Sequence, residues 1–210
     1  MSRKIQRVIL LIDSSGSMDG KPIENVKNAI KALSKKIDEY NSLSSRIELQ
    51  IISFATTARY ISKNNINSLC AYGRTNLADA YKKLNLIFKK HTHFDYAPII
   101  MLLCDGEPNL CDHTLALKKL KQNKVFNKSL KIAFAYGKQD EDTLRVLQDF
   151  TGNHENVLQD NRISTIKYVL QHSLPMVIKR QAKQDNKHYE DLMKIIANDV
   201  RKYNVVRNAS

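Results

Sequence analysis

The feature that most constrains the fold of this 210-residue sequence is the alternation of short apolar runs with segments of helical periodicity. Val8 to Ile12 is an uninterrupted apolar run, and the segment after it repeats apolar side chains every third or fourth position from Ile23 to Ile37. Continuous apolar runs are typical of strands that are buried on both faces, whereas the longer period is typical of amphipathic helices. We therefore predict an α/β fold: a doubly wound, mostly parallel sheet with helices on both faces.

The remaining elements follow from the same two patterns. Strands are expected at residues 8–12, 46–54, 57–61, 99–103 and 131–136 and near Val157, and the pair 46–54 and 57–61 suggests a hairpin. Helices are expected over the stripe from Ile23 to Ile37, with Pro22 in its first turn, from Leu77 to Phe88, and over residues 115–121, 140–150 and 163–173.

Pro175 interrupts this alternation, so we divide the chain into a domain of residues 1–178 and an extension of residues 179–210. The extension begins as a basic linker. Apolar side chains then recur at helical spacing from Tyr189 to Tyr203, which predicts an amphipathic C-terminal helix. We expect this helix to pack back on the domain, and docking to a partner is the alternative.

Cysteine usage and charge narrow the class of protein. The three cysteines, Cys70, Cys104 and Cys111, form no C-x-x-C pair, which indicates neither a disulfide framework nor a four-ligand zinc site. The first apolar run is too short for a signal peptide or a membrane span, so we expect a soluble, cytoplasmic protein. The formal net charge of +13 points to acidic partners.

Three loops hold the most informative polar residues. They are Asp13-Ser14-Ser15-Gly16-Ser17 after the first strand, Gly73-Arg74-Thr75-Asn76 at the start of a helix, and Cys104-Asp105-Gly106-Glu107 after the strand at 99–103. In an open parallel sheet, ligands bind outside the carboxyl ends of the strands, so these loops can converge on one point. The convergence would bring together two carboxylates and three hydroxyls, an all-oxygen set that suits Mg²⁺, Mn²⁺ or Ca²⁺. Two carboxylates and neutral hydroxyls also leave a coordination position open for water or for an acidic group of a partner.

These residues resemble the metal-ion-dependent adhesion site of the von Willebrand factor A domain family, over roughly residues 5 to 175. The D-x-S-x-S motif after the first strand, the Thr in a glycine-containing loop and the later Asp-Gly fill all five ligand positions of that motif. The resemblance implies that Ser15, Ser17 and Thr75 bind the metal directly. It implies that Asp13 and Asp105 bind it directly or through water.

Finer features resemble the bacterial TerY-like (YegL-like) group associated with tellurium resistance. They are the stretches Ile12 to Glu24, Leu103 to Pro108 and Ile132 to Gly137. This resemblance implies a non-enzymatic binding module in a bacterial stress-response or defence system, alongside protein kinases and phosphatases. Two positions depart from the common pattern: Arg74 stands where many relatives have glycine, and Cys104 replaces a Thr or Ser.

Other interpretations of the same residues are weaker. Taken alone, the D-x-S-x-S loop is better explained as a hydrogen-bonded turn with helix caps, and only its combination with Thr75 and Asp105 favours the metal site. The segment from Gly16 to Lys21 has the wrong glycine spacing for a phosphate-binding P-loop, and Ser17 lacks the G-x-S-x-G elbow of a hydrolase. Seven lysines and no acid lie between His113 and Gln139, which keeps nucleic-acid binding open as the alternative function.

Overall fold

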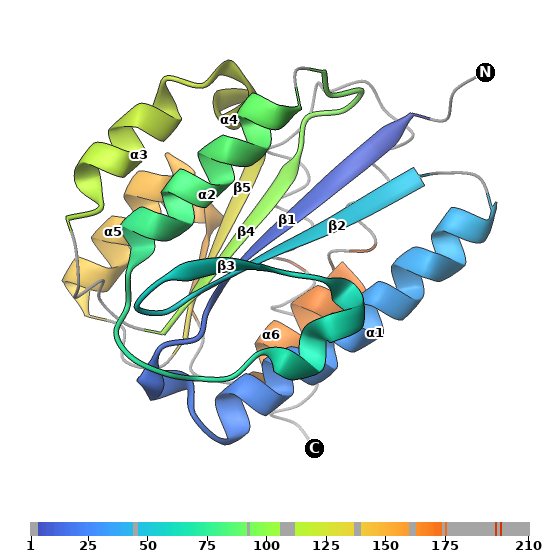
Figure 1. Cartoon of the computed structure of the whole chain (residues 1–210), viewed down its shortest axis with the longest axis horizontal. Coiled ribbons are helices and arrows are strands. Elements are labelled where there is room, and N and C mark those ends of the chain that lie inside the picture. The colour runs from blue at the N-terminus through green and yellow to red at the C-terminus, as the bar shows by residue number, and fades with distance from the viewer. Residues whose placement is uncertain are drawn as a thin grey trace.

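The computed structural model describes residues 4–43, 46–91, 93–105, 112–136, 140–159, 163–173, 175, 196 and 198. Its centre is a six-stranded sheet in the order β3-β2-β1-β4-β5-β6 (Figure 1). The strands are β1 (Ile5–Asp13), β2 (Arg46–Phe54), β3 (Ala58–Ile61), β4 (Ile99–Cys104), β5 (Leu130–Ala135) and β6 (Val157–Gln159). All neighbours pair in parallel except β2 and β3, which form an antiparallel hairpin. The predicted α/β fold is confirmed.

Helices cover both faces of this sheet (Figure 1). The helix α1 (Lys21–Leu43) packs on one face with α6 (Ile163–Tyr168), which continues as a π-helical segment at Val169–Ser173. The opposite face carries α2 (Leu77–Lys90), α3 (Thr114–Lys121), α4 (Lys124–Lys128) and α5 (Glu141–Thr151). Short 3-10 helices lie at Gly16–Met18, Lys63–Ser68 and His154–Asn156.

The pleat of β1 divides the apolar core into two layers. Val8, Leu10 and Ile12 contact the cluster built with α1, whereas Ile9 and Leu11 contact the cluster built with α2 and α5. Successive side chains of a strand point to opposite faces, so an unbroken apolar run is what a strand covered on both sides requires. The register places Asp13, the last residue of β1, opposite Phe54 of β2.

Helix ends follow from local chemistry. The side chain of Asn76 accepts a hydrogen bond from the Asp79 amide at the start of α2, and Asp140 accepts one from the Thr143 amide at the start of α5. Gly152 ends α5 in the left-handed region, at φ 75°, and its amide donates to the Gln148 carbonyl.

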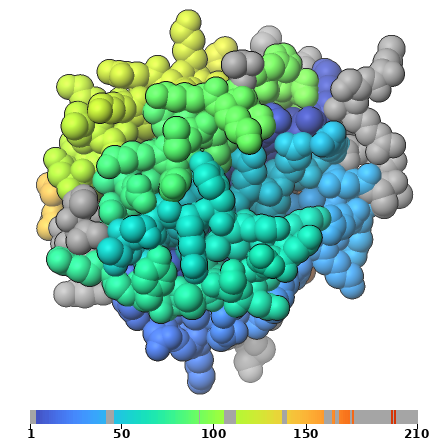
Figure 2. Space-filling model, viewed as in Figure 1, coloured from blue at the N-terminus to red at the C-terminus, as the bar shows by residue number. Residues whose placement is uncertain are grey.

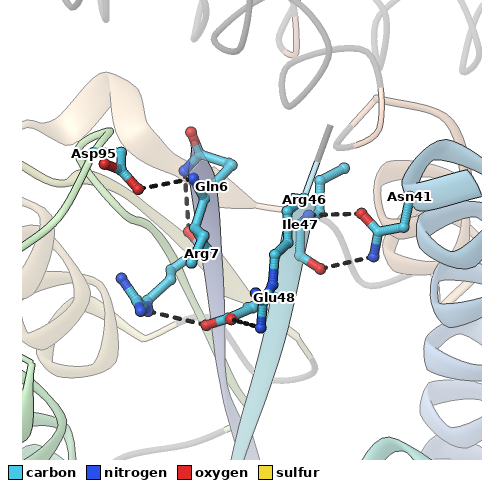
Figure 3. A network of polar contacts seen from close by, with 8 residues as sticks. Gln6, Arg7, Asn41, Arg46, Ile47, Glu48 and Asp95 are labelled. Atoms are coloured by element: carbon cyan, nitrogen blue, oxygen red, sulfur yellow. Dashed lines mark hydrogen bonds and ion pairs between the residues drawn. The ribbon is translucent and has the colours of Figure 1, made fainter. Parts of the chain in front are cut away.

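The amino-terminal ends of β1 and β2 are joined by a polar network (Figure 3). Arg7 Nε lies 3.2 Å from Glu48 Oε2, and Arg46 Nη2 lies 3.1 Å from Glu48 Oε1. Asp95, in the loop before β4, accepts a hydrogen bond of 2.9 Å from the Ile5 amide. The network holds this end of the sheet together, opposite to the edge at which the predicted site lies.

Of the predicted extension, only Ile196 and Asn198 belong to the described residues, and both are helical. Ile196 is fully buried in the cluster that contains α1. The basic linker and the rest of the C-terminal helix lie outside the described residues, and the division at residue 178 stays a prediction. No described helix is long and apolar enough to cross a membrane.

Candidate metal site

The first loop of the candidate site is anchored to the sheet by Ser14. Its amide donates to the Phe54 carbonyl at 2.8 Å, and its hydroxyl lies 2.6 Å from the hydroxyl of Ser53. With Ser14 tied to β2, the chain turns so that the Ser15 amide donates to Asp13 Oδ1 at 2.8 Å. The hydroxyls of Ser15 and Ser17 lie 3.0 Å apart. The D-x-S-x-S motif therefore presents a carboxyl group and two hydroxyls together.

The second loop is bonded to the first through the backbone. The Tyr72 amide donates to the Ser14 carbonyl at 2.9 Å, and the Gly16 amide donates to the Gly73 carbonyl at 3.0 Å. Gly73 has a φ of +65°, and a Cβ atom there would lie 2.2 Å from Thr56 Oγ1, so only glycine fits. These contacts place Thr75, which is buried, two residues beyond the bond to the first loop.

The third loop follows β4 and brings the second carboxyl group. The Cys104 thiol donates to Asp13 Oδ2 at 3.2 Å. The Asp105 carboxyl is within hydrogen-bonding reach of the side chains of Asp13, Ser15 and Ser17. One of its oxygens, Oδ1, is buried and has no hydrogen-bond partner among the described residues. Such an orphaned acceptor is costly unless something binds it.

Both carboxyl groups of the candidate site have raised pKa values. Burial, and secondly the charge of Asp105, raise the pKa of Asp13 to about 7, and hydrogen bonds from Ser15 and Cys104 offset this only in part. Burial also raises the pKa of Asp105. In a poorly hydrated site, two neighbouring carboxyl groups favour their protonated forms, because burial and mutual repulsion disfavour the charged ones. A divalent cation would compensate those charges.

The structure thus brings together Asp13, Ser15, Ser17 and Asp105 and bonds the loop of Thr75 to them. Gly106 and Glu107 lie outside the described residues. Among the described residues no group of three or more His, Cys, Asp and Glu side chains has an arrangement that could hold a metal ion by itself. The side chains that do converge offer two carboxyl groups and serine hydroxyls. Such oxygen donors fit a hard divalent cation.

The sequence did not reveal two supporting contacts. The sequence pattern assigns no polar contact to Cys104, but its thiol donates to Asp13. The hydroxyl pair of Ser14 and Ser53 joins adjacent strands at the base of the loop. Only the position of Cys104 beside Asp105 could have signalled the first contact, and no sequence signal marks the second.

Part of the chain matches the model of a known domain family. Residues 8–107 match the model of the von Willebrand factor type A domain. No curated protein sequence matches this chain.

Three solved structures illustrate the similarity of fold. The vWF domain of the type V pili tip protein from Porphyromonas gingivalis has a TM-score of 0.67 at 10% identity, with 88% of this chain and 98% of that chain covered. Proximal thread matrix protein 1 of the mussel byssus, with a zinc-occupied MIDAS motif, has a TM-score of 0.63 at 14% identity, with 84% and 46% covered.

The third is the pilus adhesin SpaC of Lactobacillus rhamnosus GG, with a TM-score of 0.67 at 12% identity and 85% and 31% covered. The chain therefore spans about half the length of the mussel protein and less of the adhesin. Residues 8–107, which contain β2, β3, β4 and most of β1, therefore match the von Willebrand factor type A domain model, and the fold as a whole is similar to that of the solved structures named above.

Proposed function

We propose that this protein is a metal-dependent protein-binding module. The observation that carries the proposal is the convergence of two carboxyl groups with raised pKa values beside serine hydroxyls, where Asp105 Oδ1 has no hydrogen-bond partner among the described residues. Asp13, Ser15, Ser17, Thr75 and Asp105 would hold a divalent cation. When bound, the cation supplies a positive centre that attracts a carboxylate of a partner.

Magnesium is the proposed cation, and Mn²⁺ or Ca²⁺ are the alternatives, because the donors are all oxygen atoms. The mussel protein, whose MIDAS motif is occupied by zinc, makes Zn²⁺ a necessary comparison. The proposed partner is a protein that provides an acidic side chain. The positive net charge of the chain supports an acidic partner because it attracts one over long range.

The proposed setting is the cytoplasm of a bacterium, in a stress-response or tellurium-resistance-like system with kinase or phosphatase partners. The resemblance of the motif stretches to the TerY-like group supports this setting. We propose a binding role rather than a catalytic one, because the site is made of metal-ligand types and the sequence pattern offers Ser17 no hydrolase elbow.

Nucleic-acid binding is the second candidate function, and the surface of α3 and α4 favours it. Its lysines are exposed, and no ion pair involves them within the described part of the chain: Lys118, Lys119, Lys121, Lys124 and Lys128. Such a surface attracts phosphate groups without sequence preference.

Direct titration of the full chain tests the primary proposal. Calorimetry with MgCl₂, MnCl₂, CaCl₂ and ZnCl₂ should show one site that Asp13→Ala or Ser15→Ala abolishes. Asp19→Ala is the matched control, because this exposed acid lies in the same segment but outside the site. Equal metal binding by all variants would refute the assignment of the site.

Capture of an acidic partner tests the function. It should require Mg²⁺, be lost in chelator, and survive Asp19→Ala but not Asp13→Ala. Capture that ignores both the chelator and the Asp13 variant would contradict the proposed function. Circular dichroism on each variant shows that the fold is intact.

A further inference from the structure

The outer edge of β2 is covered by β3 over only part of its length. β3 pairs with residues 51–54 of β2, from Ile51 opposite Ile61 to Phe54 opposite Ala58. Beyond Ile61 the chain leaves the sheet and forms the 3-10 helix Lys63–Ser68. Within the described part of the chain, the amino-terminal half of β2 therefore has no neighbouring strand on its outer side.

In the amino-terminal half of β2, the backbone groups of alternate residues face outward, away from β1. The side chain of Asn41, in α1, bonds the backbone of Ile47 as a neighbouring strand would (Figure 3). Its Nδ2 donates to the Ile47 carbonyl at 3.0 Å, and its Oδ1 accepts from the Ile47 backbone amide at 2.6 Å. Alternate residues of a strand direct their backbone groups to the same side, so the groups of Leu49 also face outward. No hydrogen bond to them is found among the described residues.

Cavities flank this open position on both faces of the sheet. On the α1 face, a cavity of about 370 Å³ is lined by Ser34, Ile37, Ile47 and Leu49, among others. On the α2 face, a cavity of about 550 Å³ is lined by Gln50, Tyr60, Leu86 and Ile87, among others. An extended peptide sends successive side chains to opposite faces, so these two cavities match the side chains of one added strand.

The α2-face cavity lies on an exposed apolar surface. Tyr60 and Leu86 are each 52% exposed, and the only other large hydrophobic side chain as exposed among the described residues is Leu115. Figure 2 shows the face on which β3 and α2 lie side by side. Water-exposed apolar side chains beside unpaired strand groups are the combination that β-strand addition uses.

The charges beside the open edge favour an acidic peptide. Lys90 lines the α2-face cavity, is exposed, and forms no ion pair with any described residue. Glu48, the carboxylate that lines the α1-face cavity, is already neutralised by Arg7 and Arg46. A peptide with an acidic residue next to its apolar ones would therefore complement this surface.

We propose that the edge of β2 at Leu49 is a docking site for an extended segment of a partner protein, with alternating apolar side chains and a flanking acid. The backbone of this segment bonds Leu49, one side chain enters the α1-face cavity and its neighbour enters the cavity at Leu86. Leu49 pairs with Val8, five residues before Asp13 along β1, and no residue of the candidate metal site lines either cavity, so binding at this edge needs no metal. The docking site goes beyond the proposed metal-dependent function, and an experiment can refute one proposal without refuting the other.

A display library of random heptapeptides, presented to the full chain in chelator, tests the proposal. The selection should enrich peptides with alternating apolar residues and an acid. Leu86→Gln should weaken a selected synthetic peptide roughly tenfold, the loss expected for about 1.4 kcal/mol of apolar contact. Leu115→Gln, the matched control on α3, should leave its affinity unchanged.

Amide hydrogen exchange tests the strand geometry itself. The Leu49 amide should exchange rapidly in the free protein and at least tenfold more slowly when saturated with the peptide. N-methylation of the peptide residue that bonds Leu49 should abolish this protection. The proposal is overturned if no peptide family is enriched, if Leu86→Gln and Leu115→Gln bind alike, or if the exchange of Leu49 does not change.

Discussion

Replacing Asp13 with Asn should stabilise the metal-free protein at neutral and alkaline pH while removing its response to metal. Asp13 is fully buried, and burial together with Asp105 raises its pKa from 3.8 to about 7. A carboxyl whose pKa is raised by folding favours the folded state below its unfolded pKa, and this contribution is lost as the pH rises through the folded pKa. The metal-free domain therefore loses stability between about pH 4 and pH 7, and the loss is complete above about pH 7.

The magnitude follows from the two pKa values. A shift from 3.8 to about 7 corresponds to roughly 4 kcal/mol between the fully protonated and fully ionised forms. In chelator, the free energy of unfolding of the Asn variant should therefore gain on that of the wild type by up to about 4 kcal/mol between pH 4 and pH 8. The Asn side chain keeps the hydrogen bond from the Ser15 backbone amide, because its Oδ1 still accepts.

Metal should reduce the stability advantage of the Asn variant at neutral and alkaline pH. At a Mg²⁺ concentration of about 100 times Kd, a bound cation stabilises the wild type by roughly 2.7 kcal/mol, and the Asn variant gains nothing. Urea denaturation at several pH values, in chelator and then in Mg²⁺, measures both effects. Parallel pH profiles of the two proteins in chelator, or equal stabilisation by Mg²⁺, would refute the reasoning.

Three further predictions concern other parts of the molecule. Gly73→Ala should cost at least about 2 kcal/mol of unfolding free energy and weaken Mg²⁺ binding, because the new Cβ would meet Thr56. The control Gly152→Ala, where nothing lies within 4 Å of the new Cβ, should cost about 1 kcal/mol and leave Mg²⁺ affinity unchanged. Denaturation measures the stabilities and calorimetry measures the Mg²⁺ affinities. Lys131→Met should destabilise the domain by about 1–3 kcal/mol, because the Lys131 ammonium donates hydrogen bonds to the carbonyls of Phe126 and Ser129 at 3.0 Å. Lys128 is exposed, so the control Lys128→Met should change stability by less than about 0.5 kcal/mol in the same denaturation assay. Replacing Lys118, Lys119 and Lys121 with Gln should flatten the salt dependence of random DNA binding without changing Mg²⁺ affinity, and an unchanged salt slope would argue against the second candidate function.

Much of the fold could be predicted from local patterns. The strand run at Val8 to Ile12 and the helical stripe from Ile23 to Ile37 lie within β1 and α1, and the predicted hairpin is the antiparallel pair β2 and β3. Helix α4 was missed because its five residues are too few to show a period. It forms because Asn123 caps its first turn and Phe126 is buried beneath it.

The candidate site was predictable in composition but not in its electrostatics. The motif named Asp13, Ser15, Ser17, Thr75 and Asp105, and the α/β pattern implied that their loops lie at the carboxyl edge of the sheet. How deeply each carboxyl is buried depends on atoms from three separate segments. No periodicity reports that quantity.

What the sequence determined by itself is everything that depends on neighbours within a few residues: the elements, the two-sided burial of β1 and the oxygen-rich loops. The tertiary structure alone decided the raised pKa of Asp13 and, within the described part of the chain, the unpartnered oxygen of Asp105 and the open edge of β2 at Leu49. Each of these depends on where a strand ends relative to another one far away in the chain. Desolvation and hydrogen-bond satisfaction are properties of that packing rather than of any local segment.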